Sequence, residues 1–327
     1  MTVPNSRAFD VANAANFVRE ASERIAGFVL ETPVPRISDE AKRFGSTEVY
    51  LKLENLQRTG SFKLRGAANR VFALSQDEAT RGVVTSSTGN HGLGVTAAGR
   101  HRGIDVEVFV SPQVSPKKRA SMEACGARIR ILGNNALEAE IIARAAAADS
   151  GRTYVPPYND PWVVAGQGTI ALELTEQVPH IDVIYVAVGG GGLISGIGSY
   201  FKWVSPHTEV VGCWPENSRV LYESLNAGAI VEFPEKATLS ESTAGGVEPG
   251  SITFAICQKV VRRHLLVSEA EILTAMRWAK TRGWTVEGAA GVAIAGAGKD
   301  ALRADGKKIA IVVCGGNLSP EVAKKLE

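Results

Sequence analysis

The chain has 327 residues, a length that suits two modest domains or one large α/β unit. Its 36 Lys+Arg and 34 Asp+Glu leave a formal charge of +2 without a basic block, so neither nucleic acid nor an anionic membrane is an expected partner. Hydrophobic residues make up 45% and charged residues 21%, which excludes disorder for most of the chain. The apolar runs are far shorter than the ~20 residues of a membrane helix.

The cysteines show neither a CxxC pair nor neighbouring histidines, and they lie far apart at Cys125, Cys213, Cys257 and Cys314. This spacing predicts no zinc site and no disulfide framework, and it suits a reducing compartment. The first twenty residues carry Asp10 and Glu20 and lack a continuous apolar core, so no secretion signal is expected. The predicted location is the cytoplasm.

Short β-branched runs alternate with longer Ala-rich helical patterns from about residue 49 onward, which is typical of repeated βαβ units around a parallel sheet. The predicted strands, in chain order, are 49–53, 82–87, 106–110, 127–132, 183–188, 209–214 and 308–314. Between residues 136 and 151 strong helix formers end in a glycine, which predicts a capped helix. The fold class is therefore α/β.

The segment YVPPYNDP (154–161) is too rich in proline to continue that helix, and it marks the best domain boundary. The short βα units before it predict a small domain at 76–150, inserted into a large domain made of 1–75 and 151–327. A loop at 239–254 is rich in Ser, Thr, Gly and Pro, and long ordered loops in α/β proteins are more often functional than decorative.

Lys63 is the first residue of chemical interest. A single lysine is usually a solvated surface residue. Here, however, Gly60 and Ser61 permit close backbone approach and Phe62 supplies an apolar neighbour. A lysine that loses water in such a place also loses proton affinity, and it becomes a usable nucleophile or imine partner.

Residues 85–94, TSSTGNHGLG, follow a predicted strand and open a predicted helix. Ser, Thr, Asn and Gly at a helix start are ordinary capping residues. Free N–H groups and hydroxyls at a helix N-terminus also form a ready site for a carboxylate, and open α/β sheets bind ligands at the carboxyl ends of their strands. The segment is compatible with both capping and binding.

In residues 186–198, VAVGGGGLISGIG, four consecutive glycines follow a buried strand and lead into a helix. A tight turn would explain one or two of them, but four are costly in backbone entropy and favour a loop that wraps an anion such as phosphate. The run also contains an imperfect G-x-G-x-x-S, so a dinucleotide-binding turn stays open as an alternative. Against that alternative, Ser195 replaces the third glycine.

The last strand ends in IVVCGGNLSP (311–320), with Cys314 at its final position. A buried cysteine is usually a small, inert hydrophobe. At the carboxyl edge of a parallel sheet it could instead present a neutral thiol to the ring nitrogen of a bound cofactor.

Together these segments resemble the fold type II, tryptophan-synthase-β-like family of pyridoxal 5′-phosphate enzymes, and within it the threonine/serine dehydratase and serine racemase branch. The likeness covers nearly the whole chain, and the motifs follow in the family's order as SFKLRGA, SSTGNHG, AGQGTIALE, GGGGLISG and CGGN. The resemblance implies two open, twisted, mainly parallel sheets flanked by helices, with a large domain and a smaller inserted one. It also implies pyridoxal phosphate as the cofactor.

Carried over residue by residue, the resemblance makes Lys63 the lysine that holds the cofactor and later moves the α-proton of the substrate. The catalytic pair is Lys63 and Thr88. The implied cofactor site comprises Phe62, Lys63, Asn90, Gly189, Gly190, Gly191, Gly192, Leu193 and Cys314, with Asn90 on the ring hydroxyl, the glycines and the Leu193 amide on the phosphate and Cys314 on the pyridine nitrogen. The implied pocket for the substrate carboxylate comprises Ser87, Thr88 and His91.

The function implied is that of an ammonia-lyase that dehydrates a β-hydroxy amino acid of the threonine or serine type and releases a 2-keto acid and ammonia. A thiol at the ring nitrogen would not hold that nitrogen protonated, which favours prompt β-elimination over a long-lived carbanion. The expected partner is a small amino-acid substrate. By analogy with the relatives the chain is expected to form a homodimer.

Departures from the family pattern concern the substrate and the metal. The family's divalent-cation site needs acidic residues where this chain has Trp214, Ser218 and Val220, so no structural cation is predicted there. Relatives tend to carry an acidic residue where this chain has Gly245, and a serine where it has Cys314. Both changes suggest a larger pocket and the hydroxyectoine-utilisation or phenylserine dehydratase branch.

Three alternatives remain open. The first is an amino-acid racemase on the same scaffold, although Thr88 stands where racemases place their second acid/base serine. The second is a nicotinamide-dependent oxidoreductase that uses the glycine run. The third is a cofactor-binding protein without catalytic activity, which the retention of Lys63, Asn90 and the glycine run argues against.

Overall fold

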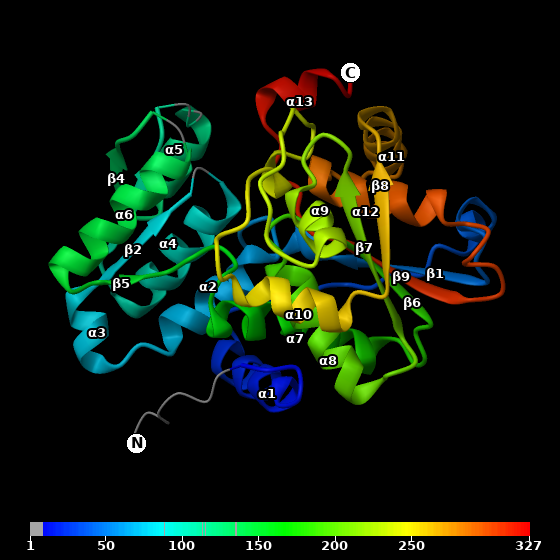
Figure 1. Cartoon of the computed structure of the whole chain (residues 1–327), viewed down its shortest axis with the longest axis horizontal. Coiled ribbons are helices and arrows are strands. Elements are labelled where there is room, and N and C mark those ends of the chain that lie inside the picture. The colour runs from blue at the N-terminus through cyan, green and yellow to red at the C-terminus, as the bar shows by residue number, and fades with distance from the viewer. Residues whose placement is uncertain (1–8, 88, 113, 115, 135) are drawn as a thin grey trace.

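Two parallel sheets form the framework of the computed structural model, which describes residues 9–87, 89–112, 114, 116–134 and 136–327. Within these residues the larger sheet has the strand order β1-β9-β6-β7-β8 and the smaller one β4-β3-β2-β5. All neighbouring strands are parallel, with β1 in register so that Leu53 lies opposite Val313 of β9. The α/β class with two parallel sheets is thus confirmed (Figure 1).

The strands of the larger sheet are β1 (Glu48–Leu53), β6 (Val183–Ala187), β7 (Glu209–Pro215), β8 (Arg263–Val267) and β9 (Lys308–Val313). Those of the smaller sheet are β2 (Val83–Ser86), β3 (Val106–Val110), β4 (Arg128–Ile131) and β5 (Thr153–Tyr154). Each of the seven predicted strands corresponds to one of these. The prediction missed β5 and β8.

Helices cover both faces of each sheet. Those around the larger sheet are α1 (Ala14–Ile25), α2 (Lys63–Phe72), α7 (Pro161–Gln177), α8 (Gly192–Val204), α9 (Val220–Ala227), α10 (Ile252–Val260), α11 (Glu269–Thr281), α12 (Gly288–Lys299) and α13 (Pro320–Lys324). Short 3-10 turns lie at η1 (Ser38–Phe44), η2 (Glu54–Leu56) and η3 (Glu241–Thr243). Helix α12 contacts β6, β7, β8 and β9, while α8 contacts β6 and β7.

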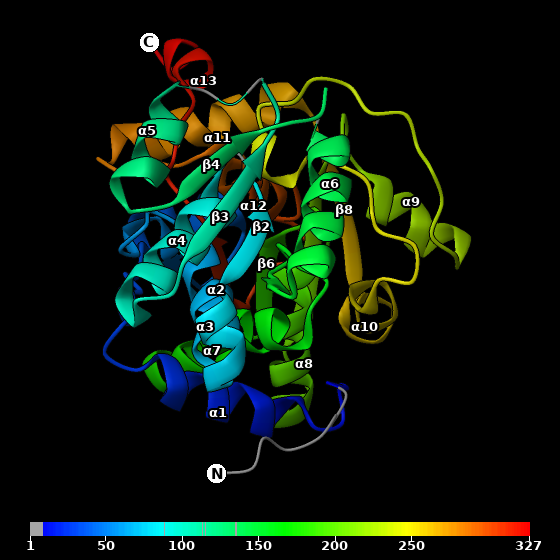
Figure 2. The same ribbon diagram turned by 90° about the vertical axis from the view of Figure 1, so that its left-hand side faces the viewer.

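The smaller sheet carries α3 (Gln76–Arg81), α4 (Asn90–Arg102), α5 (Pro116–Ala124) and α6 (Ala136–Ser150). Helix α6 packs on β2, β3 and β5, and α4 packs on β2 and β3 from the other side (Figure 2). The predicted helix at 136–151 is present as α6, followed by Gly151 with φ 66°. Strand β5 belongs to this sheet although it lies beyond residue 150, so a small domain that ends after Tyr154 would keep the sheet whole.

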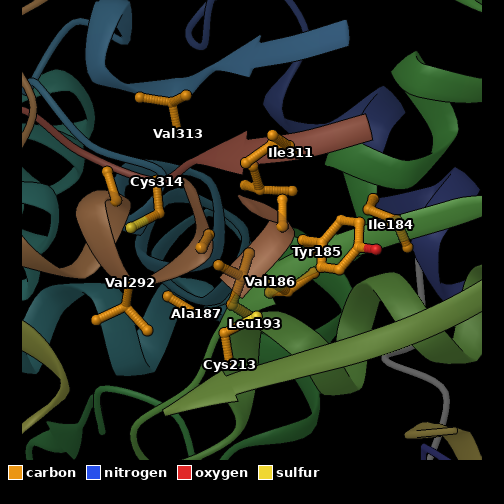
Figure 3. Packing of buried hydrophobic residues seen from close by; sticks show 14 of the residues in the cluster. Ile184, Tyr185, Val186, Ala187, Leu193, Cys213, Val292, Ile311, Val313 and Cys314 are labelled. Carbon is orange, nitrogen blue, oxygen red and sulfur yellow. The ribbon is translucent and has the colours of Figure 1, made fainter. Parts of the chain in front are cut away.

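The core of the larger unit lies between its sheet and its helices. Strand β6 is buried at every position, as expected for a central strand covered on both faces. Figure 3 shows Tyr185 of β6 and Ile311 of β9 packed in this interior, with Val292 of α12 nearby. No helix among the described residues is both long and apolar enough to cross a bilayer.

Helix α7 aligns the two helices that carry the main motifs, because it approaches both at glycines. A Cβ on Gly166 of α7 would lie 2.6 Å from the Cα of Gly66 in α2. A Cβ on Gly196 of α8 would lie 2.6 Å from the backbone nitrogen of Gly168 in α7. The AGQG motif is therefore a packing device that sets the position of α2 relative to α8.

Candidate active site

Three of the four motifs meet at the carboxyl edge of the larger sheet. Strand β1 leads through η2 into α2, β9 ends at Cys314, and β6 leads into the glycine run. The loop before α2 is tied to the loop after β9, since Phe62 N donates to Cys314 O at 3.0 Å and Gly316 N to Gly60 O at 2.9 Å. Parallel strands place their carboxyl ends at one edge, which is where open α/β sheets bind ligands.

Lys63 begins α2 and points its amine into this region. Its Nζ donates to Pro157 O at 2.8 Å and lies 5.3 Å from the centroid of the Phe62 ring. Burial lowers the pKa of Lys63 to about 8, and the charge of Glu287 opposes that shift. A lysine with such a pKa has a substantial unprotonated fraction near neutral pH, which a nucleophilic amine requires.

This pKa predicts a pH dependence for the capture of an aldehyde by Lys63. Only the free amine attacks a carbonyl, so the capture rate rises about tenfold per pH unit below the pKa and levels off above it. We expect added pyridoxal phosphate to be captured with a midpoint near pH 8, followed by absorbance in a stopped-flow instrument. A rate that still climbs steeply above about pH 9.5 would indicate an ordinary, solvated lysine.

A buried ion network anchors the first turn of α2. Arg65 lies two residues after Lys63 and is fully buried. Its guanidinium donates twice to Glu54, each time at 2.8 Å, and contacts Glu173 of α7 at 2.5 and 2.9 Å. Lys52 Nζ, also fully buried, contacts Glu173 at 2.5 Å. Because residues 63 and 65 lie about 200° apart around the helix axis, this network holds one side of α2 while Lys63 faces the site from the other.

Asn90 begins α4 and reaches across to the larger sheet's edge. Its Nδ2 donates to Glu287 Oε2 at 2.8 Å, and its Oδ1 accepts from Asn317 Nδ2 at 2.8 Å. These contacts fix the amide, and one Nδ2 hydrogen remains for a ring hydroxyl. Asn90 thus lies at the same sheet edge as Glu287 and Asn317, and its role on a ring hydroxyl stays a prediction.

Glu287 was not predicted from the sequence. It is buried and precedes α12, and its Oε1 accepts from Ser242 Oγ at 2.7 Å. The available signal was weak, because a glutamate before an Ala- and Gly-rich helix is adequately explained as an acidic residue at a helix N-terminus. Its side chain makes no capping hydrogen bond in the structure, so that explanation is insufficient.

His91 is present at the site as a neutral imidazole. Burial and the nearby charge of Lys63 lower the pKa of His91 to about 3. Its Nε2 lies 3.0 Å from Val155 O, an acceptor, so Nε2 carries the proton and Nδ1 has none to donate. A role for His91 in binding a carboxylate therefore falls to its backbone N–H in the first turn of α4.

The other two residues of the predicted carboxylate pocket are Ser87 and Thr88. Ser87 directly follows β2, and its Oγ accepts from Gly89 N at 3.2 Å. Thr88 lies outside the described residues, so its predicted catalytic and binding roles stay predictions. A Cβ on Gly89 would meet no atom within 4 Å, so the loop borders open space.

The glycine run Gly189–Gly192 connects β6 to α8 and presents that helix's N-terminus to the site. Gly191 has φ 85°, which favours glycine. A Cβ on Gly190 would lie 2.6 Å from the ring of Tyr158, and one on Gly189 would lie 2.7 Å from Thr243 O. Part of the glycine requirement therefore comes from packing. The first N–H groups of a helix, including that of Leu193, lack intrahelical acceptors and suit a phosphate.

Cys314 follows β9 and is buried, and burial raises the pKa of its thiol well above the ordinary value. The group is a neutral thiol at neutral pH, as expected for a partner of an unprotonated ring nitrogen. The sulfur of Cys314 also lies among the apolar side chains of the core, as Figure 3 shows.

The burial of the cysteines predicts how they react. The thiolate is the nucleophile, and burial raises the pKa of Cys257 to about 12 and also raises that of Cys213. Cys125 is half-buried, while Cys213, Cys257 and Cys314 are buried. We expect iodoacetamide to modify Cys125 alone in the native protein, as peptide mass spectrometry would detect. Equal modification of Cys314 would contradict the burial of its thiol.

The residues present fit pyridoxal phosphate. Lys63 offers an amine with a lowered pKa, Asn90 an amide donor, Cys314 a neutral thiol, and α8 an N-terminus for the phosphate. Comparison with known proteins agrees with this chemistry: the model of a family described as pyridoxal-phosphate dependent enzyme matches residues 25–315.

The chain belongs to this family of pyridoxal-phosphate dependent enzymes. It is 38% identical to an L-threonine ammonia-lyase of Thermotoga maritima over 94% of this chain and 77% of that protein. It is 36% identical to the catabolic L-threonine dehydratase of Escherichia coli K12 over 95% and 94% of the two chains. Relatives at this level make it a lyase with pyridoxal phosphate as cofactor.

Solved structures in the same family share the whole architecture. A serine racemase from Dictyostelium discoideum superposes with a TM-score of 0.86 at 33% identity, covering 93% of this chain and 98% of that one. A threonine deaminase from Solanum lycopersicum superposes with a TM-score of 0.89 at 29% identity, covering 100% and 96%. The fold type II assignment is thereby confirmed.

Trp214, one of the residues that replace the acidic ligands of the family's cation site, lies in an aromatic cluster. Trp214 is buried, and its ring lies 5.8 Å from that of Tyr222 and 5.4 Å from that of His264. Across the described part of the chain, no group of three or more His, Cys, Asp or Glu side chains is arranged to hold a metal ion.

Proposed function

We propose that the enzyme is an ammonia-lyase that dehydrates a β-hydroxy amino acid to a 2-keto acid and ammonia. The observation that carries the proposal is the position of Lys63, a half-buried lysine whose amine bonds Pro157 O and has a pKa of about 8, at the same sheet edge as Asn90, Cys314 and the glycine run. The names of the relatives from Thermotoga maritima and Escherichia coli support threonine-type substrates.

Each residue has a defined task in this proposal. When bound, pyridoxal phosphate withdraws electrons from the Cα of an amino acid and so acidifies the Cα proton. Lys63 would hold the cofactor through its amine and would serve as the base for that proton. Asn90 would orient the ring, and the phosphate would be held by the glycine run Gly189–Gly192 and the N–H group of Leu193. Ser87, Thr88 and the backbone of His91 bind the substrate carboxylate.

The thiol of Cys314 bears on the choice between reactions. A neutral thiol does not hold a ring nitrogen protonated, so negative charge on the substrate carbon is less stabilised than beside an aspartate. Loss of the β-hydroxyl relieves that charge at once. The thiol therefore favours elimination over slow reprotonation.

An amino-acid racemase is the second candidate, favoured by similarity to the serine racemase of Dictyostelium discoideum. It needs a competent acid on the opposite ring face, which is the role predicted for Thr88. Incubation with one enantiomer followed by chiral analysis separates the two functions. The lyase proposal expects keto acid without the other enantiomer.

The substrate is proposed to be bulkier at Cβ than serine or threonine, in the manner of phenylserine or an amino acid derived from hydroxyectoine. Gly245 and Gly246 of the 239–254 loop are exposed, and a Cβ on either would meet no atom within 4 Å. The loop also borders the site, since Ser242 bonds Glu287 and Thr243 packs on Gly189. Two glycines without side chains in a loop that contacts the site support a larger substrate side chain.

The assay that tests the proposal measures keto acid and ammonia from serine, threonine, 3-hydroxyaspartate, phenylserine and hydroxyectoine-derived amino acids in both stereochemical series. Stoichiometric keto acid and ammonia from at least one of them is expected. Their absence across the whole panel, with pyridoxal phosphate bound, would contradict the proposal. A preference for serine over phenylserine would contradict its bulky-substrate part.

We also propose a small domain, predicted at 76–150 and extended to Tyr154 so that β5 stays with its sheet, and a large domain made of the rest of the chain. The homodimer and the cytoplasmic location are further parts of the proposal. Analytical ultracentrifugation of the purified protein tests the dimer directly. A monomer at micromolar concentration would contradict it.

A further inference from the structure

Glu287 lies at the site but outside every motif that the sequence brought forward. It is only 5% exposed. Although it occupies the N-cap position of α12, its side chain makes no capping hydrogen bond. Its carboxylate is directed instead toward Asn90 Nδ2, at 2.8 Å from Oε2, and Ser242 Oγ, at 2.7 Å from Oε1. A carboxylate this buried, bound by donors from two other elements, is held in a defined place.

The chain makes room for this carboxylate. A Cβ on Gly315 would lie 2.8 Å from Glu287 Cδ and 2.9 Å from Oε1. Glu287 N in turn donates to Gly315 O at 2.9 Å. The first glycine of CGGN is therefore required by Glu287, which ties the carboxylate to the segment that carries Cys314.

We propose that Glu287 is a positioning residue, which fixes the amide of Asn90 for the cofactor and supplies the negative charge that faces Lys63. The inference rests on the proposed role of Lys63. It adds a residue to the site that neither the motifs nor the relatives' names assign.

The first half of the inference follows from hydrogen-bond counting. The Asn90 amide has two Nδ2 hydrogens and an accepting Oδ1. Glu287 takes one hydrogen and Asn317 Nδ2 donates to Oδ1, so the orientation of the amide is determined. The second hydrogen is left to donate to the ring hydroxyl of a bound cofactor. Without Glu287 the amide could rotate and present its oxygen instead.

The second half follows from the charges around the site. Backbone hydrogen bonds bring Glu287 close to Lys63, since Glu287 N donates to Gly315 O at 2.9 Å and Phe62 N, next to Lys63, donates to the adjacent Cys314 O at 3.0 Å. The charged groups that act on Glu287 are Lys63 of α2 and Lys118 of α5, and the thiol of Cys314 beside it is uncharged. Lys118 is shared with Glu241, 3.5 Å away. Burial raises the pKa of Glu287, and the donors Asn90 and Ser242 oppose that rise. An ionised Glu287 stabilises the ammonium form of Lys63, so its removal lowers the pKa of Lys63.

Two variants test separately the positioning of Asn90 and the effect of the Glu287 charge on Lys63. Glu287→Gln keeps the size and an acceptor for Asn90 but removes the charge. Glu287→Asp keeps the charge but withdraws it from Asn90. The matched control is Glu241→Gln, which removes a half-exposed carboxylate from the neighbouring loop. In each full-length protein, freed of cofactor, capture of pyridoxal phosphate is followed against pH, and borohydride reduction with peptide mass spectrometry verifies capture at residue 63. Affinity for the cofactor is measured by fluorescence titration.

We expect Glu287→Gln to lower the pH midpoint of capture by roughly one unit. Glu287→Asp is expected to keep the midpoint but to bind the cofactor about tenfold more weakly. The Glu241→Gln control should match the parent in both. An unchanged midpoint in Glu287→Gln would overturn the proposed effect of the Glu287 charge on Lys63. Parent-like affinity in Glu287→Asp would overturn the proposed positioning of Asn90. Each variant tests its own part of the proposal, so one of them suffices for that part if the other fails to fold. Lack of capture at Lys63 in the parent would refute the proposed function instead.

Discussion

Replacing Lys63 with alanine is expected to reduce keto-acid formation by ~10³-fold or more while leaving a folded protein. In the proposed function the amine is both the anchor for the cofactor and the base that removes the substrate proton, so both tasks would be lost together. Its amine makes one hydrogen bond, to Pro157 O, and lies over the Phe62 ring, so the loss of unfolding free energy stays below about 2 kcal/mol. Steady-state kinetics and thermal unfolding measure the two effects.

The control for this experiment is Lys202→Ala, which removes an exposed lysine of α8. It should retain parent activity and cofactor absorbance. Substantial activity in the Lys63→Ala enzyme would remove Lys63 from its assigned role, whatever its effect on stability.

Replacing Arg65 with methionine is expected to lower the free energy of unfolding by about 3–5 kcal/mol, the largest stability effect we foresee. Methionine fills part of the volume but leaves the carboxylates of Glu54 and Glu173 without the cation that binds both. Glu54 is fully buried, so it cannot recover that interaction from water. Urea denaturation followed by circular dichroism measures the change.

A matched arginine on the surface provides the comparison. Arg119 pairs with Glu123 at 2.7 Å within α5, and its side chain is 46% exposed. Arg119→Met should change the unfolding free energy by less than about 1 kcal/mol, because exposed ion pairs contribute little. A similarly small loss in Arg65→Met would contradict the view that the buried network anchors the helix of Lys63.

Much of the fold could be predicted because its strands are unusually clear. Strand β6 reads VIYVA and is buried throughout, so a continuous apolar run identified it directly. Strand β8 reads RHLLV and is only partly buried along most of its length, as an edge strand can be. Polar residues therefore hide its hydrophobic pattern in the sequence. Strand β5 has two residues, too few for any periodic signal.

The site was predictable where a motif is continuous in sequence, as around Lys63 and Gly189. It was not predictable where a single residue arrives from a distant element. Glu287 is 197 positions from Asn90 along the chain, and only the folded sheet edge brings them together. The buried ion pair between Arg65 and Glu173, which lie 108 positions apart, was not predicted for the same reason.

For the glycine run and for His91, the sequence suggested a role but did not give the full physical reason for the residue. The four glycines suggested anion binding, yet Tyr158 and Thr243 already exclude side chains at Gly190 and Gly189. His91 was predicted to line the pocket for the substrate carboxylate, yet the hydrogen bond of its Nε2 to Val155 O leaves Nδ1 as an acceptor. In both cases the deciding contacts come from residues that are distant in sequence and adjacent only in the folded structure.

The most direct test of the account is reduction of the cofactor-loaded protein with borohydride, followed by peptide mapping. The account predicts a single pyridoxyl group, carried by the peptide that contains Lys63 and attached to that residue. A pyridoxyl group on another lysine, such as the buried Lys52, or no stable adduct in a protein saturated with pyridoxal phosphate, would contradict it.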